Sequence, residues 1–521
     1  MANRNHPSGE FKTRFCVLLA LSIALTALPA RADANDPFAA LLDQQMPKLL
    51  AEYGVPGAVV AYIKDGDVAW SRAYGVASAA TGAPMRPDML VEHGSNGKAL
   101  TAWAVMKLVE QGKVDLDAPV NLYLKRWKVT SAQYDASQVT LRRLLSHTAG
   151  MNIHGYLDYS PRRASTPGLA QVLNGPRLFE GLNETFETGH FSLGRAELVA
   201  PPGAGYKYSG AGYTVGQMVI EDVTGEPFAA FVQREITNPL GAASVRWAWT
   251  PQLIAAAAAA HGNEGQVLEY RQLANYAIGS EIATAADFAR FVAAVVPGPH
   301  GEPIGRGVLK PESVQMMIQA QPGTGGSYGL GYGIAKNYGQ PAINHAGANS
   351  GWTAYYFLDT ARRTGFVVAS NSSRASSLHL TILGLWSDAE FGPAQRQVYP
   401  PAPRWDTFAI WTFELTGVLA LALLISAAIF FWQLRTGHRI RAHKPTVGGL
   451  LRALPWLLWL LFIWYTIYSP LPLYLPYAFP DFWHSPAVPM LMIALALWVC
   501  YRVVGAFFPR LIHGRSPIDL H

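Results

Sequence analysis

Three apolar stretches near the end of the chain constrain its fold most strongly. They cover residues 408–432, 450–469 and 487–508, and each has about the 20 residues that a helix needs to cross a bilayer. The link between the first two is rich in Arg and Lys, whereas the link 470–486 contains neither. By the positive-inside rule, the basic link and the C-terminus are cytoplasmic. The sequence therefore predicts a C-terminal membrane domain, residues 401–521, with three transmembrane helices.

The N-terminus has the pattern of a secretory signal peptide. Basic residues precede an apolar run, which is followed by Ala30-Arg31-Ala32, an A-x-A cleavage signal. We expect residues 1–32 to be removed; the alternative is a retained N-terminal anchor. Either way, residues 33–400 are expected to be exported, which places them on the periplasmic side of the inner membrane.

The charge of the chain argues against nucleic-acid binding. The whole sequence has a formal net charge of +6, but residues 33–400 contain 28 basic and 30 acidic residues. The basic excess therefore belongs to the ends of the chain, and no basic stripe remains for a polyanion. The two cysteines, Cys16 and Cys500, lie outside the exported segment. We predict no disulfide, no metal site and no cofactor there.

Strand-like patterns occur at both ends of the exported segment. A helical pattern over 37–53 is followed by two β-rich runs around Asp65-Gly66, a strong hairpin signal. Helical patterns dominate residues 100–320, strand-like runs return near 325, and residues 374–391 are expected to form a closing helix. The pattern predicts an α+β fold in which one antiparallel sheet takes strands from both ends and a helical region is inserted between them.

Ser95 and Lys98 are one helical turn apart at the start of a helix-patterned stretch. Positions i and i+3 share a face, so an amine lies beside a hydroxyl, and a partly desolvated lysine can activate a serine. A helix N-terminus also favours developing negative charge. The alternative is a capping serine with a solvated lysine, and the bare pattern does not decide between them.

Two further segments carry chemistry. Tyr206 and Tyr208 lie in a loop that follows Pro201-Pro202-Gly203, and a tyrosine near a lysine can relay protons. His345 lies on a predicted strand before Ala346-Gly347, where a substrate could lie against the strand edge. The alternatives are a packed aromatic turn and a surface histidine.

These elements together resemble the serine hydrolases related to class C β-lactamases, penicillin-binding D,D-peptidases and carboxylesterases of that fold. The resemblance covers about residues 38–395. It rests on four motifs in family order: Ser95-x-x-Lys98, LLSHTAG at 144–150, PPGAGYKYSGAGY at 201–213, and HAGANSGW at 345–352 before a VVASNSS strand. It implies a β-lactamase/transpeptidase-like fold and an acyl-enzyme mechanism.

The resemblance implies catalytic roles residue by residue. Ser95 is the acylated nucleophile, Lys98 its proton partner, and Tyr208, the first residue of the Y-x-N motif, the general base and acid. The third residue of that motif is Gly210 instead of asparagine. In β-lactam-recognising relatives this asparagine holds the substrate amide, so its loss argues against efficient β-lactam hydrolysis.

The resemblance also implies a substrate-binding strand. His345 takes the place of the lysine in K-T-G, and Gly347 completes the H-x-G triplet. The oxyanion hole then consists of the backbone N–H groups of Ser95 and Ala348. His147 is expected to shape a loop. A competing G-x-S-x-G pattern places Ser327 before a glycine-rich strand instead of the helix that an α/β-hydrolase requires, so we favour Ser95.

An exported domain followed by three spans is similar in layout to the membrane-bound peptidases that mature prodrugs such as colibactin. Glu92 and Asn349 fall where such enzymes carry substrate-facing residues. The leading hypothesis is a peptidase or amidase for small peptides or N-acyl-D-amino-acid conjugates, with the membrane tether suggesting a lipid-linked or membrane-delivered substrate. The alternatives are a carboxylesterase, a β-lactamase or D,D-peptidase, and a non-catalytic ligand-binding sensor.

Overall fold

The computed structural model describes residues 36–439 except 157, 161–166, 176–194, 264, 338 and 393–404, together with 487–508 and scattered residues between 447 and 461. The predicted signal peptide, residues 1–32, lies outside the described residues.

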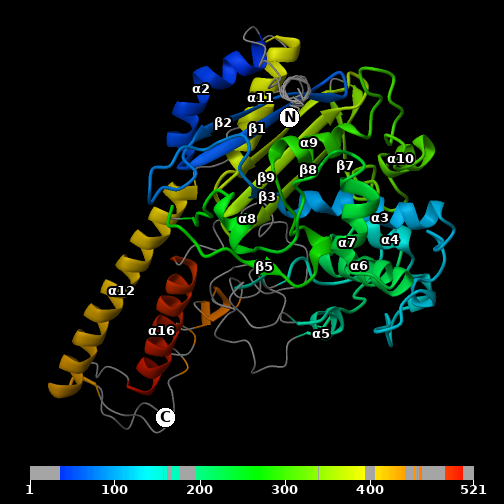
Figure 1. The fold of residues 1–521 in the computed structure, drawn as a ribbon. Helices are drawn as coiled ribbons and strands as arrows, with labels where there is room; N and C mark the ends of the chain where they lie inside the picture. The colour runs from blue at the N-terminus through cyan, green and yellow to red at the C-terminus, as the bar shows by residue number, and fades with distance from the viewer. Residues whose placement is uncertain are drawn as a thin grey trace, which may run out of the picture.

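A six-stranded antiparallel sheet forms the centre of the fold (Figure 1). Its order is β2 (Asp67–Gly75), β1 (Gly57–Lys64), β10 (Thr364–Ser370), β9 (Trp352–Asp359), β8 (Gln340–Asn349) and β7 (Gly333–Asn337). The first hairpin of the domain joins the last strands through β1 and β10, with Ala58 opposite Ser370. This confirms the predicted α+β fold with a sheet built from both ends.

Side-chain alternation along the strands divides the core into two layers. In β1, Val59 and Ile63 pack into the core shared with the helical region, whereas Val60 and Tyr62 face the layer formed by two terminal helices. These helices are α2 (Pro37–Tyr53) and α11 (Ser376–Phe391), which pack against each other. The central strands β1, β9 and β10 are therefore buried on both faces, and the helical region and α9 (Ala285–Ala293) cover one of these faces (Figure 1).

The inserted helical region holds α3 (Lys98–Glu110) and α6 (Gly210–Thr224), which pack against each other. A short 3₁₀ turn, η1 (Gly94–Gly97), leads into α3, and another, η5 (Tyr276–Ile278), lies beside both helices. The remaining elements of this region are β3 (Val91–Glu92), η2 (Val120–Leu122), η3 (Ala136–Gln138), α4 (Leu141–Leu145), β4 (Asp158–Tyr159), α5 (Leu169–Asn174), α7 (Phe228–Val232), η4 (Gln233–Thr237), α8 (Pro251–Ala255), β5 (Gln272–Leu273), β6 (Ile282–Ala283) and α10 (Pro311–Met317).

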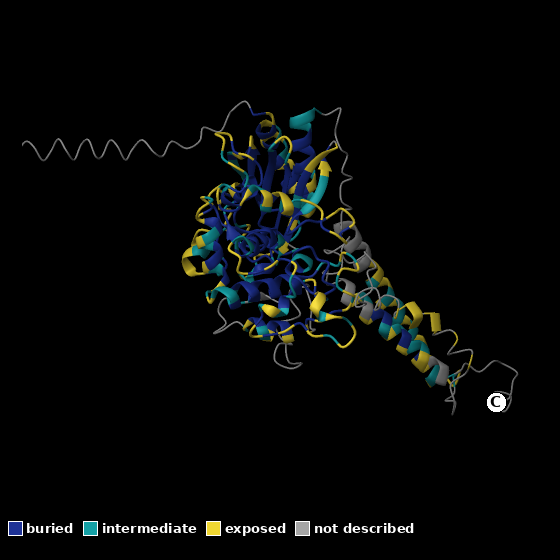
Figure 2. Cartoon of the chain, turned by 90° about the vertical axis from the view of Figure 1, so that its right-hand side faces the viewer, coloured by how far each residue is buried: buried dark blue, intermediate teal, exposed yellow. Residues whose placement is uncertain are grey.

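Two long helices follow the sheet domain, α12 (Trp405–Arg435) and α16 (Ala487–Phe507), and they lie side by side (Figure 1). Figure 2 shows that buried residues concentrate in the sheet domain, whereas these helices are largely exposed or half-buried. Among the described residues, one helical segment, Glu414–Arg435, is long and apolar enough to cross a membrane by length and composition.

The structure thus differs from the three predicted spans. The described apolar part of α16, Ile493–Val504, is shorter than a bilayer crossing requires. Most of the predicted span 450–469 lies outside the described residues. The described part of the chain therefore contains one candidate membrane-length helix, at the position of the first predicted span.

Candidate active site

Ser95 lies in η1, directly before α3, and its Oγ receives two hydrogen bonds. Lys98 Nζ donates to it at 2.9 Å, and the phenol of Tyr208 donates to it at 2.9 Å. The lysine comes from the first turn of α3, and the tyrosine comes from the loop before α6. The structure therefore brings together the three side chains that the sequence predicted to be catalytic.

The amine of Lys98 is enclosed by protein. The side chain is 1% exposed, and its Nζ also donates to the backbone carbonyl of Ile278. Nζ lies 4.9 Å from the ring centroid of Tyr208 and 5.5 Å from that of Tyr213. Burial lowers the pKa of Lys98 to about 7, although the nearby Glu281 acts in the opposite direction. The amine can therefore be neutral at physiological pH and accept the proton of Ser95.

The loop that carries Tyr208 is held from both sides. Ser209 caps α6, since its Oγ accepts from the N–H of Gly212 at 3.2 Å and donates to the carbonyl of Asn152 at 2.6 Å. A side chain at Gly210 would begin only 2.7 Å from the carbonyl oxygen of His154. The close approach of these two backbones explains why glycine replaces the asparagine of the Y-x-N pattern.

His147 supports Tyr208 from behind. Its ring stacks on the tyrosine at a centroid distance of 4.1 Å, and its Nδ1 accepts from the backbone N–H of Ser209 at 3.0 Å. Its backbone adopts a φ of +59°, which is uncommon for a residue other than glycine. These contacts belong to a side chain that positions the tyrosine loop, as expected for this motif.

His345 lies on β8 and is buried in the site. Because a carbonyl can only accept, its Nδ1 donates to the carbonyl of Ala346 at 2.8 Å. In the neutral ring its Nε2 then accepts from the phenol of Tyr328 at 2.9 Å. Burial and the charge of Lys98 lower the pKa of His345 to about 3. The ring is therefore a neutral hydrogen-bonding group, not the cation that K-T-G enzymes carry at this place.

Three glycines allow the backbones of β8 and of the segment after η5 to lie directly on the Ser95 turn. A Cβ at Gly347 would meet the carbonyl oxygen of His93 at 1.9 Å, and a Cβ at Gly94 would meet the nitrogen of Ala348 at 2.5 Å. A Cβ at Gly279 would lie 2.6 Å from the nitrogen of Ser95. The two N–H groups predicted to form the oxyanion hole, those of Ser95 and Ala348, therefore belong to segments in direct contact.

Glu92 lies behind Asn349 and holds it. Its Oε2 accepts from Asn349 Nδ2 at 2.6 Å, and its Oε1 accepts from the indole of Trp249 at 2.7 Å. The same amide of Asn349 donates to the carbonyl of Gly279 at 2.9 Å. Glu92 is buried and both of its oxygens are engaged, so it fixes the end of β8 instead of presenting a free carboxylate to a substrate.

Sequence reasoning missed Glu281, a fully buried acid beside the Ser95–Lys98 turn. Its carboxylate lies so close to Gly97 that a Cβ there would overlap with it. Burial raises the pKa of Glu281 well above its usual range. One signal could have pointed to it: it is the single charged residue in the small and apolar run AIGSEIATA, at 277–285.

The structure bears on two other kinds of site, a second serine nucleophile at Ser327 and a metal site. Ser327 lies in a glycine-rich turn that leads towards β7, where its Oγ donates to the carbonyl of Thr324 at 2.8 Å. This is not the strand-to-helix turn of an α/β-hydrolase nucleophile. In the described part of the chain, no group of three or more His, Cys, Asp or Glu side chains could hold a metal ion.

A family model described as Beta-lactamase matches residues 42–382. The chain belongs to the beta-lactamase family. It is accordingly a serine hydrolase, and the contacts made by Ser95, Lys98 and Tyr208 form its candidate catalytic centre.

The chain is similar to relatives that are named as an esterase and as a penicillin-binding protein. The chain is 34% identical over 206 residues to Esterase EstB of Burkholderia gladioli, a match that covers 39% of this chain and 50% of EstB. It is 28% identical over 323 residues to Penicillin-binding protein 4 of Amycolatopsis lactamdurans, covering 59% of this chain and 78% of that protein. The match thus spans half the length of EstB.

A solved structure supports the fold. The octameric penicillin-binding protein homologue from Pyrococcus abyssi superposes with a TM-score of 0.52 at 24% identity, covering 67% of this chain and 77% of that one. At this identity the likeness concerns the β-lactamase/transpeptidase-like fold alone.

Proposed function

We propose that this protein is a membrane-anchored serine hydrolase that cleaves esters through an acyl-enzyme on Ser95. The observation that carries the proposal is the pair of 2.9 Å contacts made to Ser95 Oγ by Lys98 and Tyr208. The proton of Ser95 passes to this pair as Oγ attacks the acyl carbonyl. The N–H groups of Ser95 and Ala348 stabilise the oxyanion, and Tyr208 returns a proton to the leaving group. Water then releases the acyl group by the same path.

The neutral state of His345 favours an ester over a substrate with a free carboxylate beside the scissile bond. A β-lactam or a D-alanyl peptide carries such a carboxylate, which a cation binds best. Here the ring accepts from Tyr328 and carries no charge. Gly210 likewise offers no side-chain amide to hold a peptide group. The alcohol or acyl part of the substrate is therefore expected to be uncharged at this place.

Amide hydrolysis is the second candidate, on small peptides or N-acyl-D-amino-acid conjugates. An amine is a poor leaving group unless it is protonated as the C–N bond breaks. Tyr208 and Lys98 provide a proton path for that step, because both contact the oxygen that attacks. An ester of an acidic alcohol needs this proton much less. Loss of Tyr208 should therefore slow the hydrolysis of amides more than the hydrolysis of such esters.

Membrane attachment is part of the same proposal. The first predicted span coincides with an apolar helix whose side chains are largely exposed, and the Arg-rich link that follows is typical of a cytoplasmic loop. Only residues 393–404 separate this helix from the described part of the sheet domain. A link of this length reaches about 40 Å when fully extended, so the active site would stay near the outer surface of the inner membrane.

Activity-based labelling and substrate profiling test the proposal. Ser95→Ala should abolish labelling by a fluorophosphonate, whereas Ser327→Ala should leave it unchanged. The full chain in detergent should then hydrolyse short p-nitrophenyl esters faster than N-acyl D- or L-amino-acid amides. Labelling that survives in Ser95→Ala and is lost in Ser327→Ala would reject the nucleophile. Faster turnover of the D-amino-acid amides would favour the second candidate.

A further inference from the structure

The carbonyl that accepts from Lys98 lies on a segment held by side chains that take no part in the reaction. That segment is η5, and Ile278 is its last residue. The following residue, Gly279, lies against the backbone of Ser95. A displacement of η5 would therefore move both the acceptor of the catalytic amine and a wall of the nucleophile turn.

Two side chains of helix α6 form hydrogen bonds with η5 and with the residue directly before it. Gln217 Oε1 accepts from the backbone N–H of Ala277 at 3.0 Å. One turn earlier, Thr214 Oγ1 accepts from Asn275 Nδ2 at 2.7 Å, directly before η5 begins. All three side chains, those of Gln217, Thr214 and Asn275, are buried, so water does not compete for these hydrogen bonds.

Helix α3, which carries Lys98, also forms a hydrogen bond with η5. Thr101 Oγ1 donates to the carbonyl of Ala277 at 2.9 Å, and Thr101 lies one turn after Lys98 on α3. Ala277 is thus held at both its N–H and its carbonyl, by Gln217 and Thr101. The next carbonyl, that of Ile278, is left pointing to the amine of Lys98.

We propose that Gln217 and Thr101 are positioning residues for the reaction, which fix η5 so that the Ile278 carbonyl orients the amine of Lys98 towards Ser95. The proposal deepens the proposed function, because it rests on Lys98 as the proton partner. Both residues act through their hydrogen bonds to the backbone of Ala277, not through contact with Ser95 Oγ.

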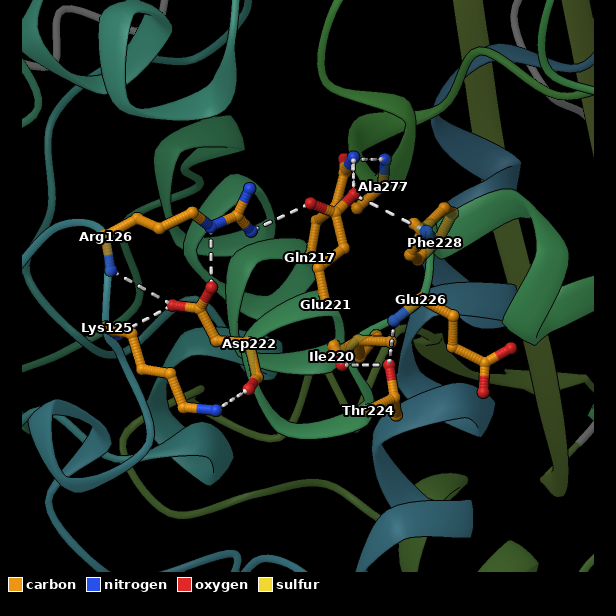
Figure 3. A network of polar contacts seen from close by, with 10 residues as sticks. All are labelled: Lys125, Arg126, Gln217, Ile220, Glu221, Asp222, Thr224, Glu226, Phe228 and Ala277. Carbon is orange, nitrogen blue, oxygen red and sulfur yellow. Dashed lines mark hydrogen bonds and ion pairs between the residues drawn. The ribbon is translucent and has the colours of Figure 1, made fainter.

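The orientation of Gln217 is itself fixed from outside. Its Nε2 donates to Glu221 Oε1 at 3.0 Å, and the other oxygen of Glu221 accepts from Arg126 at 2.8 Å (Figure 3). Because Glu221 can only accept, the amide of Gln217 must turn its NH₂ outwards and its oxygen towards Ala277. Figure 3 shows Gln217 lying between this ion pair and Ala277.

The chain offers matched variants for a test. Gln217→Met keeps the approximate volume but removes the acceptor, and Thr101→Val removes the hydroxyl while Thr101→Ser retains it. Asp359→Asn is the stability control. Asp359 is buried at the end of β9 that pairs with Ala342, at the opposite end of β8 from Asn349, and it accepts from Asn337 and Arg362.

The readout is the second-order rate of fluorophosphonate labelling of the full chain as a function of pH, which needs no knowledge of the native substrate. Gln217→Met and Thr101→Val should slow labelling by about 10- to 100-fold, since small misplacements of a catalytic group have effects of this size. The acid-side midpoint should move to lower pH, because the ammonium form of Lys98 loses an acceptor. Thr101→Ser should regain most of the rate, and Asp359→Asn should lower the melting temperature without moving the midpoint.

Three outcomes would overturn parts of this reasoning. Wild-type rates and midpoints in both Gln217→Met and Thr101→Val would reject the positioning role. An Asp359→Asn protein that loses rate and shifts its midpoint as much as they do would reduce the effect to general stability. A wild-type protein that is not labelled at Ser95 would reject the proposed function itself, before the variants are compared.

Discussion

Replacing Lys98 by methionine should stabilise the protein while it abolishes labelling of Ser95. The amine lies in a fully buried position, and burial lowers its pKa from 10.5 to about 7. Between these two values the unfolded chain binds a proton that the folded chain does not. The free energy of unfolding therefore falls as the pH drops from 10.5 to 7. Below 7 this penalty of burying the amine is complete.

The size of the effect follows from the shift. At about 1.4 kcal/mol for each pH unit, the penalty is about 4 kcal/mol at pH 7 and about 2 kcal/mol at pH 9. Methionine removes this penalty but leaves the carbonyl of Ile278 without the lysine as donor, a loss of about 1–3 kcal/mol that does not depend on pH. The variant should thus gain about 1–3 kcal/mol at pH 7.

The assay is chemical unfolding of the full chain in detergent at pH 7 and pH 9, followed by tryptophan fluorescence. The gain of Lys98→Met over wild type should shrink by about 2 kcal/mol between the two pH values. Lys107→Met is the control, because Lys107 also lies on α3 and donates to a backbone carbonyl, that of Val308, but is only half-buried. A Lys98→Met difference that is the same at both pH values, or that grows at pH 9, would refute the reasoning.

Two other predictions concern single side chains. Tyr208→Phe should lower kcat/KM, which reports acylation, by about 10²- to 10⁴-fold on amides and alkyl esters. The loss should be smaller on p-nitrophenyl esters, whose leaving group needs no proton; equal losses in kcat/KM on all of them, measured by steady-state kinetics, would contradict the role of Tyr208 as general acid. His379 is buried against Ser370 Oγ at 2.9 Å, and burial lowers its pKa to about 3, so folding stability should fall with pH below about 6.5. His379→Gln should flatten this acid-side slope by about 1.4 kcal/mol per pH unit, and an unchanged slope in unfolding curves between pH 4 and 6 would count against it.

The parts of the site that the sequence predicts are those set by local spacing and motif order. Ser95 and Lys98 lie one turn apart, and the alternation of apolar residues at both ends of the domain predicts the strands of the sheet. Tyr208 follows from its motif, and the structure places its phenol on the same oxygen as the amine of Lys98. These features can be predicted without knowing which distant segments come into contact.

The parts that the sequence does not predict depend on long-range contacts. The neutral state of His345 follows from its burial and from Lys98, which lies about 250 residues earlier in the chain. The carboxylate of Glu92 is engaged by side chains 157 and 257 residues away. Glu281 and Gln217 have no motif of their own, and their effect on Lys98 follows from burial and from the position of η5. The spacing of apolar residues within one segment carries no information on which distant side chains come into contact.

The pairing of β1 with β10 has a consequence for when the enzyme becomes active. The hairpin of β1 and β2 is made early, but its central partner is synthesised about 300 residues later, so closure of the sheet involves a very long loop. β8, which brings the N–H of Ala348 to the nucleophile turn, is also among the last strands to be made. A nascent chain that already contains Ser95, Lys98 and Tyr208 therefore lacks the strand that completes the centre. In the proposed mechanism, the order of synthesis therefore delays assembly of the oxyanion hole around Ser95 until the domain is nearly finished.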